Sequence, residues 1–366
     1  MPLLPTTVVG SYPVPEWMER LKTEYARGRM SAAQLLDVHE MAIKAALHDQ
    51  ERAGIDIVSD GELRRDNDID YFLTRMPGIE IRNPAKDFYF DYYEAALSEP
   101  LPEPEQPGPP GGTALRLADD FAFTAAHTSA PVKFSFTGPF SLARRIGGNA
   151  YADRRDLVLA IARVLNAEAR ALADRGAELL QIDEPFLAGY PEEAETAVAA
   201  VNVVTAGVPV TWALHVCYGN RYARPLWQGH YDFLFPAVLG ATVDQLVLEF
   251  ARKGYEDLPA VQRFGWDRDI GLGVIDVKSS EVETPALVAD RIRGALGLVP
   301  ADRLIINPDC GLRNLPGPVA RAKLAAMARG AATVRRELAP PAPPDLPAAP
   351  GQPASRPGSS SKEPDP

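Results

Sequence analysis

Residues 171–185 read ALADRGAELLQIDEP, a stretch that joins the end of a predicted helix to a short buried strand. Gly176 follows the helical pattern of residues 153–175, and glycine commonly ends helices because it adopts the left-handed conformation at low cost. Residues 179–183 are mostly apolar and are followed directly by polar residues, which predicts a buried strand that ends at a polar edge. A helix that leads into such a strand indicates an α/β fold.

The same helix and strand unit recurs along the chain. Helical patterns cover residues 31–52, which begin at Ser31 and end before Gly54, and also residues 192–206 and 285–296. Eight strand candidates alternate with the helices: residues 6–10, 56–59, 132–137, 179–183, 210–215, 245–250, 270–275 and 303–307. Eight parallel strands close a (β/α)8 TIM barrel, so we predict that fold. A doubly wound open sheet, which has the same alternation, is the alternative.

The domain organisation follows from two proline-rich stretches. We predict one catalytic domain over residues 1–338, with an inserted hairpin and loop region at about residues 84–130 that contains the proline-rich residues 99–112. Residues 89–93 are expected to form a hairpin strand within this insertion. Residues 339–366 contain mainly proline, small and polar residues, which cannot bury enough apolar area to offset the entropy of ordering. We therefore predict a disordered C-terminal tail.

Composition narrows the partners and the location. The chain has 366 residues, 46% hydrophobic content and a net charge of −11, which argues against nucleic acid or an anionic membrane as a partner. The start of the sequence lacks a basic segment followed by an apolar one, and no run approaches the roughly 18 apolar residues that a membrane span needs. We expect a cytoplasmic enzyme. Two cysteines, Cys217 and Cys310, allow at most one disulfide.

Polar residues follow every predicted strand. In a TIM barrel the active site gathers at the carboxyl ends of the strands, so these residues are the candidates for function. A strand can also end in polar residues simply because it reaches solvent, but the repetition at all eight strands favours a site. In chain order the candidates are Ser11, Asp60, Glu62, Thr137, Asp183, Glu184, His215, Cys217, Glu249, Asp276, Lys278, Asn307, Asp309 and Cys310.

Four of these candidates are typical zinc ligands. His215, Cys217, Glu249 and Cys310 offer one imidazole, two thiolates and one carboxylate, a set suited to tetrahedral Zn²⁺. Side chains two apart on an extended segment point to the same side, so His215 and Cys217 can face one ion. The alternative is that both cysteines are buried apolar residues and the histidine is hydrogen-bonded in the core. Zinc lowers the pKa of a bound thiol, so the site predicts alkylation of a thiol substrate.

The sequence resembles the C-terminal catalytic barrel of the cobalamin-independent methionine synthase family over roughly residues 6–338. The segments that carry the resemblance are VVGSYP at 8–13, SDGELRRDNDIDYF at 59–72, FTGPFS at 136–141, QIDEP at 181–185, HVCYGN at 215–220 and INPDCGL at 306–312. The resemblance implies transfer of a methyl group to homocysteine to form methionine. It also implies Zn²⁺ as the cofactor, held by His215, Cys217, Glu249 and Cys310.

The family also suggests roles for the residues that bind substrate. The resemblance implies that Ser11, Glu62 and Asp183 hold the amino acid, and two carboxylates suit its ammonium group. After the seventh strand the family has a histidine that assists proton delivery, whereas this chain has Lys278. Lys278 and Asp183 are therefore the candidate catalytic residues. The neighbouring residues Arg64, Arg65 and Asp66 are expected to form a solvated network.

Two departures from the family concern the methyl donor. The family's second, N-terminal barrel, which helps to bind polyglutamyl methyl-folate, is absent from this chain, as in the family's short single-barrel branch. The run Leu142 to Arg145 replaces the tryptophan on which a pterin ring would stack. We therefore expect methylcobalamin or another corrinoid as donor, free or carried on a corrinoid protein, rather than methyl-folate.

Three other functions are weighed against this one. A related zinc enzyme opens epoxides with the thiol coenzyme M, but its sulfonate would call for basic groups where this chain has Glu62 and Asp183. A barrel of the porphyrinogen decarboxylase type needs no metal and leaves both cysteines without a purpose. A closed structural zinc site would hold four ligands and admit no exogenous thiol.

Overall fold

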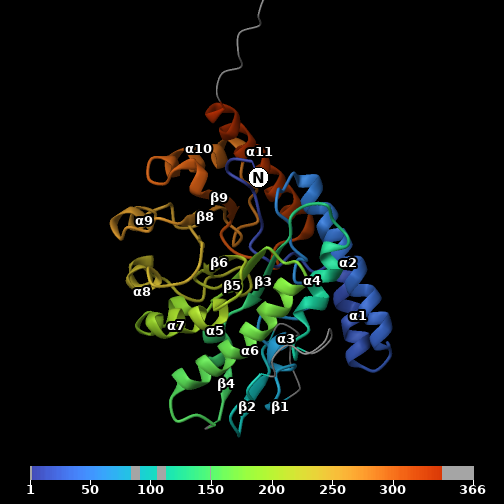
Figure 1. Cartoon of the computed structure of the whole chain (residues 1–366). Helices are drawn as coiled ribbons and strands as arrows, with labels where there is room; N and C mark the ends of the chain where they lie inside the picture. Colours follow the sequence, from blue (N-terminus) through green and yellow to red (C-terminus); the bar gives the residue numbers. More distant parts are fainter. Residues whose placement is uncertain (1, 84–90, 105–112, 149, 340–366) are drawn as a thin grey trace, which may run out of the picture.

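The strand predicted at residues 179–183 is β5 (Leu179–Asp183), and it lies inside a six-stranded parallel sheet (Figure 1). The computed structural model describes residues 2–83, 91–104, 113–148 and 150–339. The strand order is β3-β5-β6-β7-β8-β9, and each strand is parallel to its neighbour. The other strands are β3 (Lys133–Thr137), β6 (Thr211–Val216), β7 (Gln245–Leu248), β8 (Asp269–Ile275) and β9 (Leu304–Pro308). The predicted α/β fold with a parallel sheet is confirmed.

The first two predicted strands form isolated bridges instead of regular strands. Thr6 pairs in parallel with Ile306 of β9, and Thr7 pairs with Ile57. Val58 in turn pairs with Val132, directly before β3. These bridges therefore run from β9, at one edge of the sheet, to the start of β3 at the other edge.

Helices surround the sheet and follow most of its strands (Figure 1). The longest are α2 (Ala32–Ala53), α6 (Arg154–Asp174) and α11 (Gly317–Leu338). Ser31 caps α2 through a reciprocal capping box with Gln34, and Gly54 ends it at φ 85°, as the sequence predicts. The remaining helices are α1 (Glu16–Ala26), α3 (Asp70–Leu73), α4 (Leu117–Ala125), α5 (Pro139–Ala143), α7 (Ala194–Thr205), α8 (Phe235–Val238), α9 (Pro259–Arg263) and α10 (Pro285–Leu296).

A small second sheet lies within the predicted insertion and beside it. Its strands are β1 (Ile79–Asn83), β2 (Glu94–Leu97) and β4 (Ile146–Gly147), with β1 antiparallel to β2. The hairpin strand predicted at residues 89–93 is wrong for residues 91–93, which form no strand, because the two paired strands lie on either side of them. Residues 89–90 lie outside the described residues. So do residues 340–366, where the disordered tail was predicted.

The interior combines an apolar core with a few buried polar side chains. The core forms one large cluster of apolar residues from Leu4 to Val334. Val9, Ala213 of β6 and Val247 of β7 form a separate small cluster, and Lys133 and Gln181 are fully buried. In the part of the chain that the structure describes, no helix has the length and apolarity needed to span a membrane.

Candidate metal and substrate site

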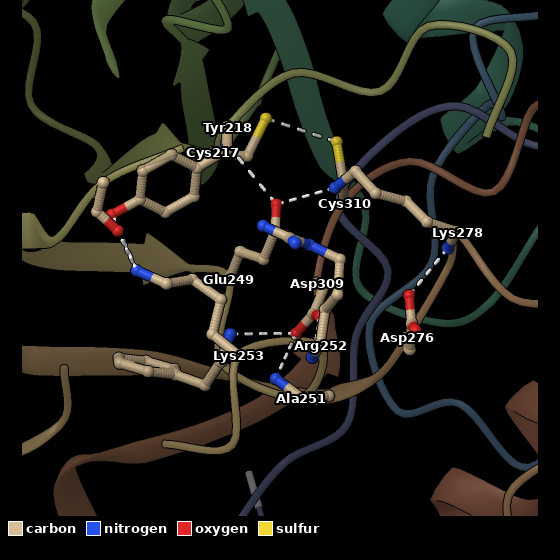
Figure 2. Close-up of polar contacts among 12 residues, drawn as sticks. Cys217, Tyr218, Glu249, Ala251, Arg252, Lys253, Asp276, Lys278, Asp309 and Cys310 are labelled. Carbon is tan, nitrogen blue, oxygen red and sulfur yellow. Dashed lines mark hydrogen bonds and ion pairs between the residues drawn. The ribbon is translucent and has the colours of Figure 1, made fainter. Parts of the chain in front are cut away.

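Three of the four predicted metal ligands meet at the carboxyl edge of the sheet. His215 is in β6, Cys217 follows it, and Cys310 follows β9. One donor atom from each lies within 4.8 Å of the others, and the two sulfur atoms are 3.4 Å apart. Figure 2 shows the two thiols facing each other above Glu249. Parallel strands bring these distant segments together because their carboxyl ends share one edge of the sheet.

The imidazole of His215 is oriented for metal binding. Its Nδ1–H donates to the Val247 carbonyl at 3.0 Å, which leaves Nε2 as the nitrogen with a free lone pair. Nε2 is buried and has no hydrogen-bond partner among the residues that the structure describes. A buried acceptor without a partner is costly, and a cation that shares it with two sulfurs removes that cost. The donor set fits a soft or borderline divalent ion such as zinc.

The electrostatics of the cluster are consistent with a bound cation. The hydrogen bond to Cys217 and burial raise the pKa of the Cys310 thiol well above its ordinary value. Burial lowers the pKa of His215, but the neighbouring Cys310 and Asp183 outweigh burial and raise the pKa overall. Two thiolates at this distance therefore require a positive partner before both can exist near neutral pH.

Glu249, the fourth predicted ligand, lies beside the cluster and is held by two cations. Its side chain is fully buried, and Oε2 accepts from Lys278 Nζ at 2.7 Å while Oε1 accepts from Arg252 Nε at 2.5 Å. Figure 2 shows this arrangement next to the cysteines. The three-residue group of candidate ligands therefore does not include Glu249. Lys278, a predicted catalytic residue, has a side chain only 4% exposed and lies beside the thiols.

The predicted substrate residues line the same cavity as the cluster. The cavity has a volume of about 140 Å³, and its lining includes Ser11, Glu62, Asp183, His215, Cys217 and Cys310. Glu62 adopts φ 55°, which is uncommon outside glycine, and its Oε1 accepts from Ser135 Oγ at 2.9 Å. Burial raises the pKa of Asp183 to about 7. The cavity therefore combines two carboxylates with a thiol and imidazole cluster.

Two acidic residues at strand ends have structural roles instead. Glu184 directly follows β5 and is buried. Its carboxylate reaches the start of α5, where it accepts from the Phe140 and Ser141 backbone amides at 3.0 and 2.8 Å. Asp309 accepts in the same way from backbone amides of residues 250–252, at 2.8 to 3.0 Å (Figure 2). Both carboxylates fix loops at the carboxyl edge of the sheet. Their polar character at a strand end therefore reflects a structural role and not substrate binding.

Sequence reasoning missed two residues that shape the cavity. Arg313 lines it and donates to the carbonyls of Glu62, Arg65 and Asp66 at 2.9 to 3.0 Å, which fixes the segment that carries Glu62. Asn220 also lines the cavity and donates to the Gly311 carbonyl at 3.1 Å. Asn220 is the last residue of the segment 215–220 and Arg313 directly follows the segment 306–312, so their positions in the sequence were the available signal.

The expectation of a solvated network at residues 64–66 is wrong for Arg65. Its side chain is only 2% exposed, and its guanidinium lies 5.2 Å from the Phe134 ring centroid and 5.5 Å from that of Phe72. The nearest carboxylates, on Asp60 and Glu62, are 3.9 and 3.8 Å away. Arg65 therefore belongs to the buried interior and not to a solvated network.

Fold and site together define a class: an α/β protein with a thiol and imidazole cluster at the carboxyl edge of a parallel sheet. Residues 4–333 match the family described as "Cobalamin-independent synthase, Catalytic domain", and the chain belongs to this family. The methionine synthase of Sulfurisphaera tokodaii is 34% identical over 339 residues, which cover 92% of this chain and 94% of that protein. The methionine synthase of Saccharolobus solfataricus is also 34% identical over 339 residues, and this match covers 92% of this chain and 97% of that protein.

A solved structure supports the same assignment. The B12-independent methionine synthase from Shewanella sp. W3-18-1, in complex with selenomethionine, superposes with a TM-score of 0.77 at 27% identity. The match covers 92% of this chain and 99% of the Shewanella chain. The resemblance inferred from the sequence motifs is therefore confirmed.

Proposed function

We propose that this protein is a homocysteine S-methyltransferase that forms methionine with the help of a zinc ion, in a (β/α)8 barrel. The convergence of His215, Cys217 and Cys310 in a cavity with two carboxylates is the observation that carries the proposal. The isolated bridges support the barrel, because they supply two further parallel segments, residues 6–7 and residues 57–58. These segments lie between β9 and the start of β3.

The proposed metal site uses His215, Cys217 and Cys310, with Glu249 as a fourth, exchangeable ligand. Zinc held there would lower the pKa of the substrate thiol and keep it as the thiolate near neutral pH. Glu249 lies close enough to Cys217 for its carboxylate to accept weakly from the next backbone amide, that of Tyr218, at 3.4 Å. Its pairing with Lys278 and Arg252 holds it beside the thiols and balances its charge.

The amino acid is proposed to bind through Ser11, Glu62 and Asp183. The two carboxylates offer acceptors for an ammonium group, and Arg313 holds the Glu62 segment in place. The related Shewanella protein was solved in complex with selenomethionine, a product-like amino acid, which supports an amino-acid ligand for this chain. The same carboxylates disfavour coenzyme M, because its sulfonate is negative.

The methyl donor is proposed to be methylcobalamin, free or on a corrinoid protein, in preference to methyl-folate. The segment Leu142 to Arg145 carries no indole on which a pterin could stack, and its two arginines already lie against tyrosine rings. Lys278 is proposed to act in transfer through its fixed positive charge, because its ammonium pairs with Glu249 at 2.7 Å beside the thiols. Burial lowers the pKa of Lys278, but the neighbouring Cys310 and Glu249 outweigh burial and raise it, which keeps the ammonium charged.

Metal analysis and a turnover assay test the proposal together. The purified protein should contain about one zinc per chain and convert homocysteine, but not coenzyme M, with methylcobalamin; methyl-folate is assayed in parallel. Cys310→Ser should lose both zinc and activity. Lys278→Gln should keep zinc and lose turnover by about 10²- to 10³-fold, while Lys44→Gln, on the surface, should change neither. A zinc-free active protein, or full activity in Cys310→Ser, contradicts the proposal.

A further inference from the structure

A second cavity, of about 400 Å³, lies next to the site and is lined by four arginines. Arg82 comes from β1, Arg144 and Arg145 follow α5, and Arg154 begins α6. One carboxylate, on Glu94, also lines it. We call the cavity lined by these four arginines the arginine groove. A concave surface with this much positive charge is unexpected on a chain whose net charge is −11.

The positive charge of the arginine groove is mostly unpaired. Arg144 forms an ion pair with Glu193 at 3.0 Å. Among the residues that the structure describes, Arg82, Arg145 and Arg154 have no ion-pair partner, and the buried Nε of Arg145 has no hydrogen-bond partner. Within the described ranges, the Arg154 guanidinium donates to the Ala143 carbonyl at 2.7 Å and to no carboxylate. Like charges gathered in a concavity repel one another, so an anion that enters it is stabilised.

Tyr92 separates the arginine groove from the proposed methyl-transfer site. It lines both cavities, and its hydroxyl donates to Asp68 at 2.9 Å. Its ring packs edge-on against Phe186, with centroids 6.2 Å apart. On the groove side the Arg145 guanidinium lies 4.6 Å from the ring centroid. A molecule that extends past Tyr92 can therefore occupy both cavities at once.

We infer that the arginine groove binds the anionic group of the methyl donor while the donor's methyl-bearing end reaches past Tyr92 to the thiol site. This inference rests on the proposed function. Planar guanidinium groups bind phosphate and carboxylate oxygens in pairs, so the ligand chemistry is a phosphodiester or a set of carboxylates. A corrinoid with a nucleotide loop supplies the phosphodiester, and a glutamylated pterin supplies the carboxylates.

The first test measures anion binding without turnover. Tripolyphosphate is titrated into the zinc-loaded protein by calorimetry, and the Arg82→Gln/Arg145→Gln variant should bind it about tenfold more weakly. The matched control is Arg329→Gln, an exposed arginine on α11, which should bind it as the wild type does. In steady-state assays of the wild-type enzyme, tripolyphosphate should compete with the donor and not with homocysteine. Because this experiment uses no variant, its result does not depend on whether a variant folds.

The second test separates the two sources of anion. Initial rates are compared for methylcobalamin, for methylcobinamide, which lacks the phosphodiester, and for mono- and triglutamyl methyl-tetrahydrofolate. A phosphodiester ligand predicts about a tenfold rise in the variant's KM for methylcobalamin and none for methylcobinamide. A carboxylate ligand predicts a rise that is larger for the triglutamyl donor.

The outcomes distinguish this inference from the proposed function. If tripolyphosphate affinity and every donor KM change less than twofold in the variant, the inference is wrong while methyl transfer itself stands. If the wild type transfers no methyl group at all, the proposed function fails, and calorimetry still reports whether the groove binds anions. Unchanged homocysteine affinity in the variant establishes that the neighbouring site remains folded.

Discussion

Lys133 and Lys323 are both fully buried, but their ammonium groups have opposite surroundings. Lys323 Nζ donates to the Asp276 carbonyl at 3.0 Å and to Glu283 Oε2 at 2.8 Å. Lys133 Nζ has no hydrogen-bond partner within the described part of the chain, and burial lowers its pKa to about 7. The charged form of Lys133 is therefore destabilised in the folded protein, whereas that of Lys323 is compensated.

Lys133→Met should stabilise the protein, and the gain should depend on pH. Between pH 7 and 10.5 the unfolded chain binds more protons at this lysine than the folded chain, so the stability of the wild type rises with pH. The substitution removes this dependence. The gain in unfolding free energy should reach at most about 4 kcal/mol at pH 7 and fall to about 1 kcal/mol at pH 9.5. Urea denaturation at both pH values measures it.

Lys323→Met is the matched control for that experiment. It leaves buried acceptors without a donor, so it should destabilise the protein by about 3 kcal/mol. Equal losses for both lysines would show that Lys133 has a partner that compensates its charge.

At the same scale, the sequence could predict which residues meet but not how each is paired. His215, Cys217 and Cys310 were predictable because every strand end in a parallel sheet faces one edge, so position along the strand decides the neighbourhood. The pairing of Glu249 with Lys278 was not, because it depends on side-chain directions across two strands. Arg65 was misjudged because nothing in a charged stretch reveals that aromatic rings enclose one member of it.

At the scale of elements, helices with clear caps were predicted closely and strands with few partners were not. α10 has the predicted bounds, 285–296, and β5 the predicted 179–183. Residues 6–10 and 56–59 carry the same apolar signal as β5, yet they form only isolated bridges. A strand's extent depends on how long its neighbours remain parallel and in register, and that information is not local.

Glu184 shows how one element depends on another, because it ties the loop after β5 to the start of α5. Its carboxylate accepts from two backbone amides and from Ser141 Oγ at 2.6 Å, all buried. Glu184→Ala should lower the unfolding free energy by about 3 kcal/mol, since these donors lose their acceptor. Chemical denaturation measures the loss. Glu195→Ala, on the exposed side of α7, should stay within about 0.5 kcal/mol, and a similar loss there would argue against this role.

At the scale of the whole molecule, one contact network joins the N-terminal segment at Thr6, the segment at residues 56–58 and the last helix, α11. Asp56 Oδ2 accepts from the Thr6 amide and hydroxyl, both at 2.7 Å, and forms an ion pair with Arg335 of α11. Arg335 also donates to the carbonyls of Leu3 and Leu4 at 2.8 Å. These segments pair with the six-stranded sheet through single bridges and not through regular strands, so the network adds to what holds them in place.

Asp56→Ala should therefore loosen the junction between the two edges of the sheet. The buried Thr6 amide loses its acceptor, which should lower the unfolding free energy by about 2 kcal/mol and speed hydrogen exchange at residues 6–9 more than within β5 or β6. Asp232→Ala is the control, because Asp232 pairs with Arg263 where both side chains are more than half exposed, and it should cost less than about 1 kcal/mol. Uniformly faster exchange across the sheet would instead mean that the junction opens only with global unfolding. In that case the N-terminal segment belongs to the same cooperative unit as the six strands, and its bridges are as stable as the regular strands they join.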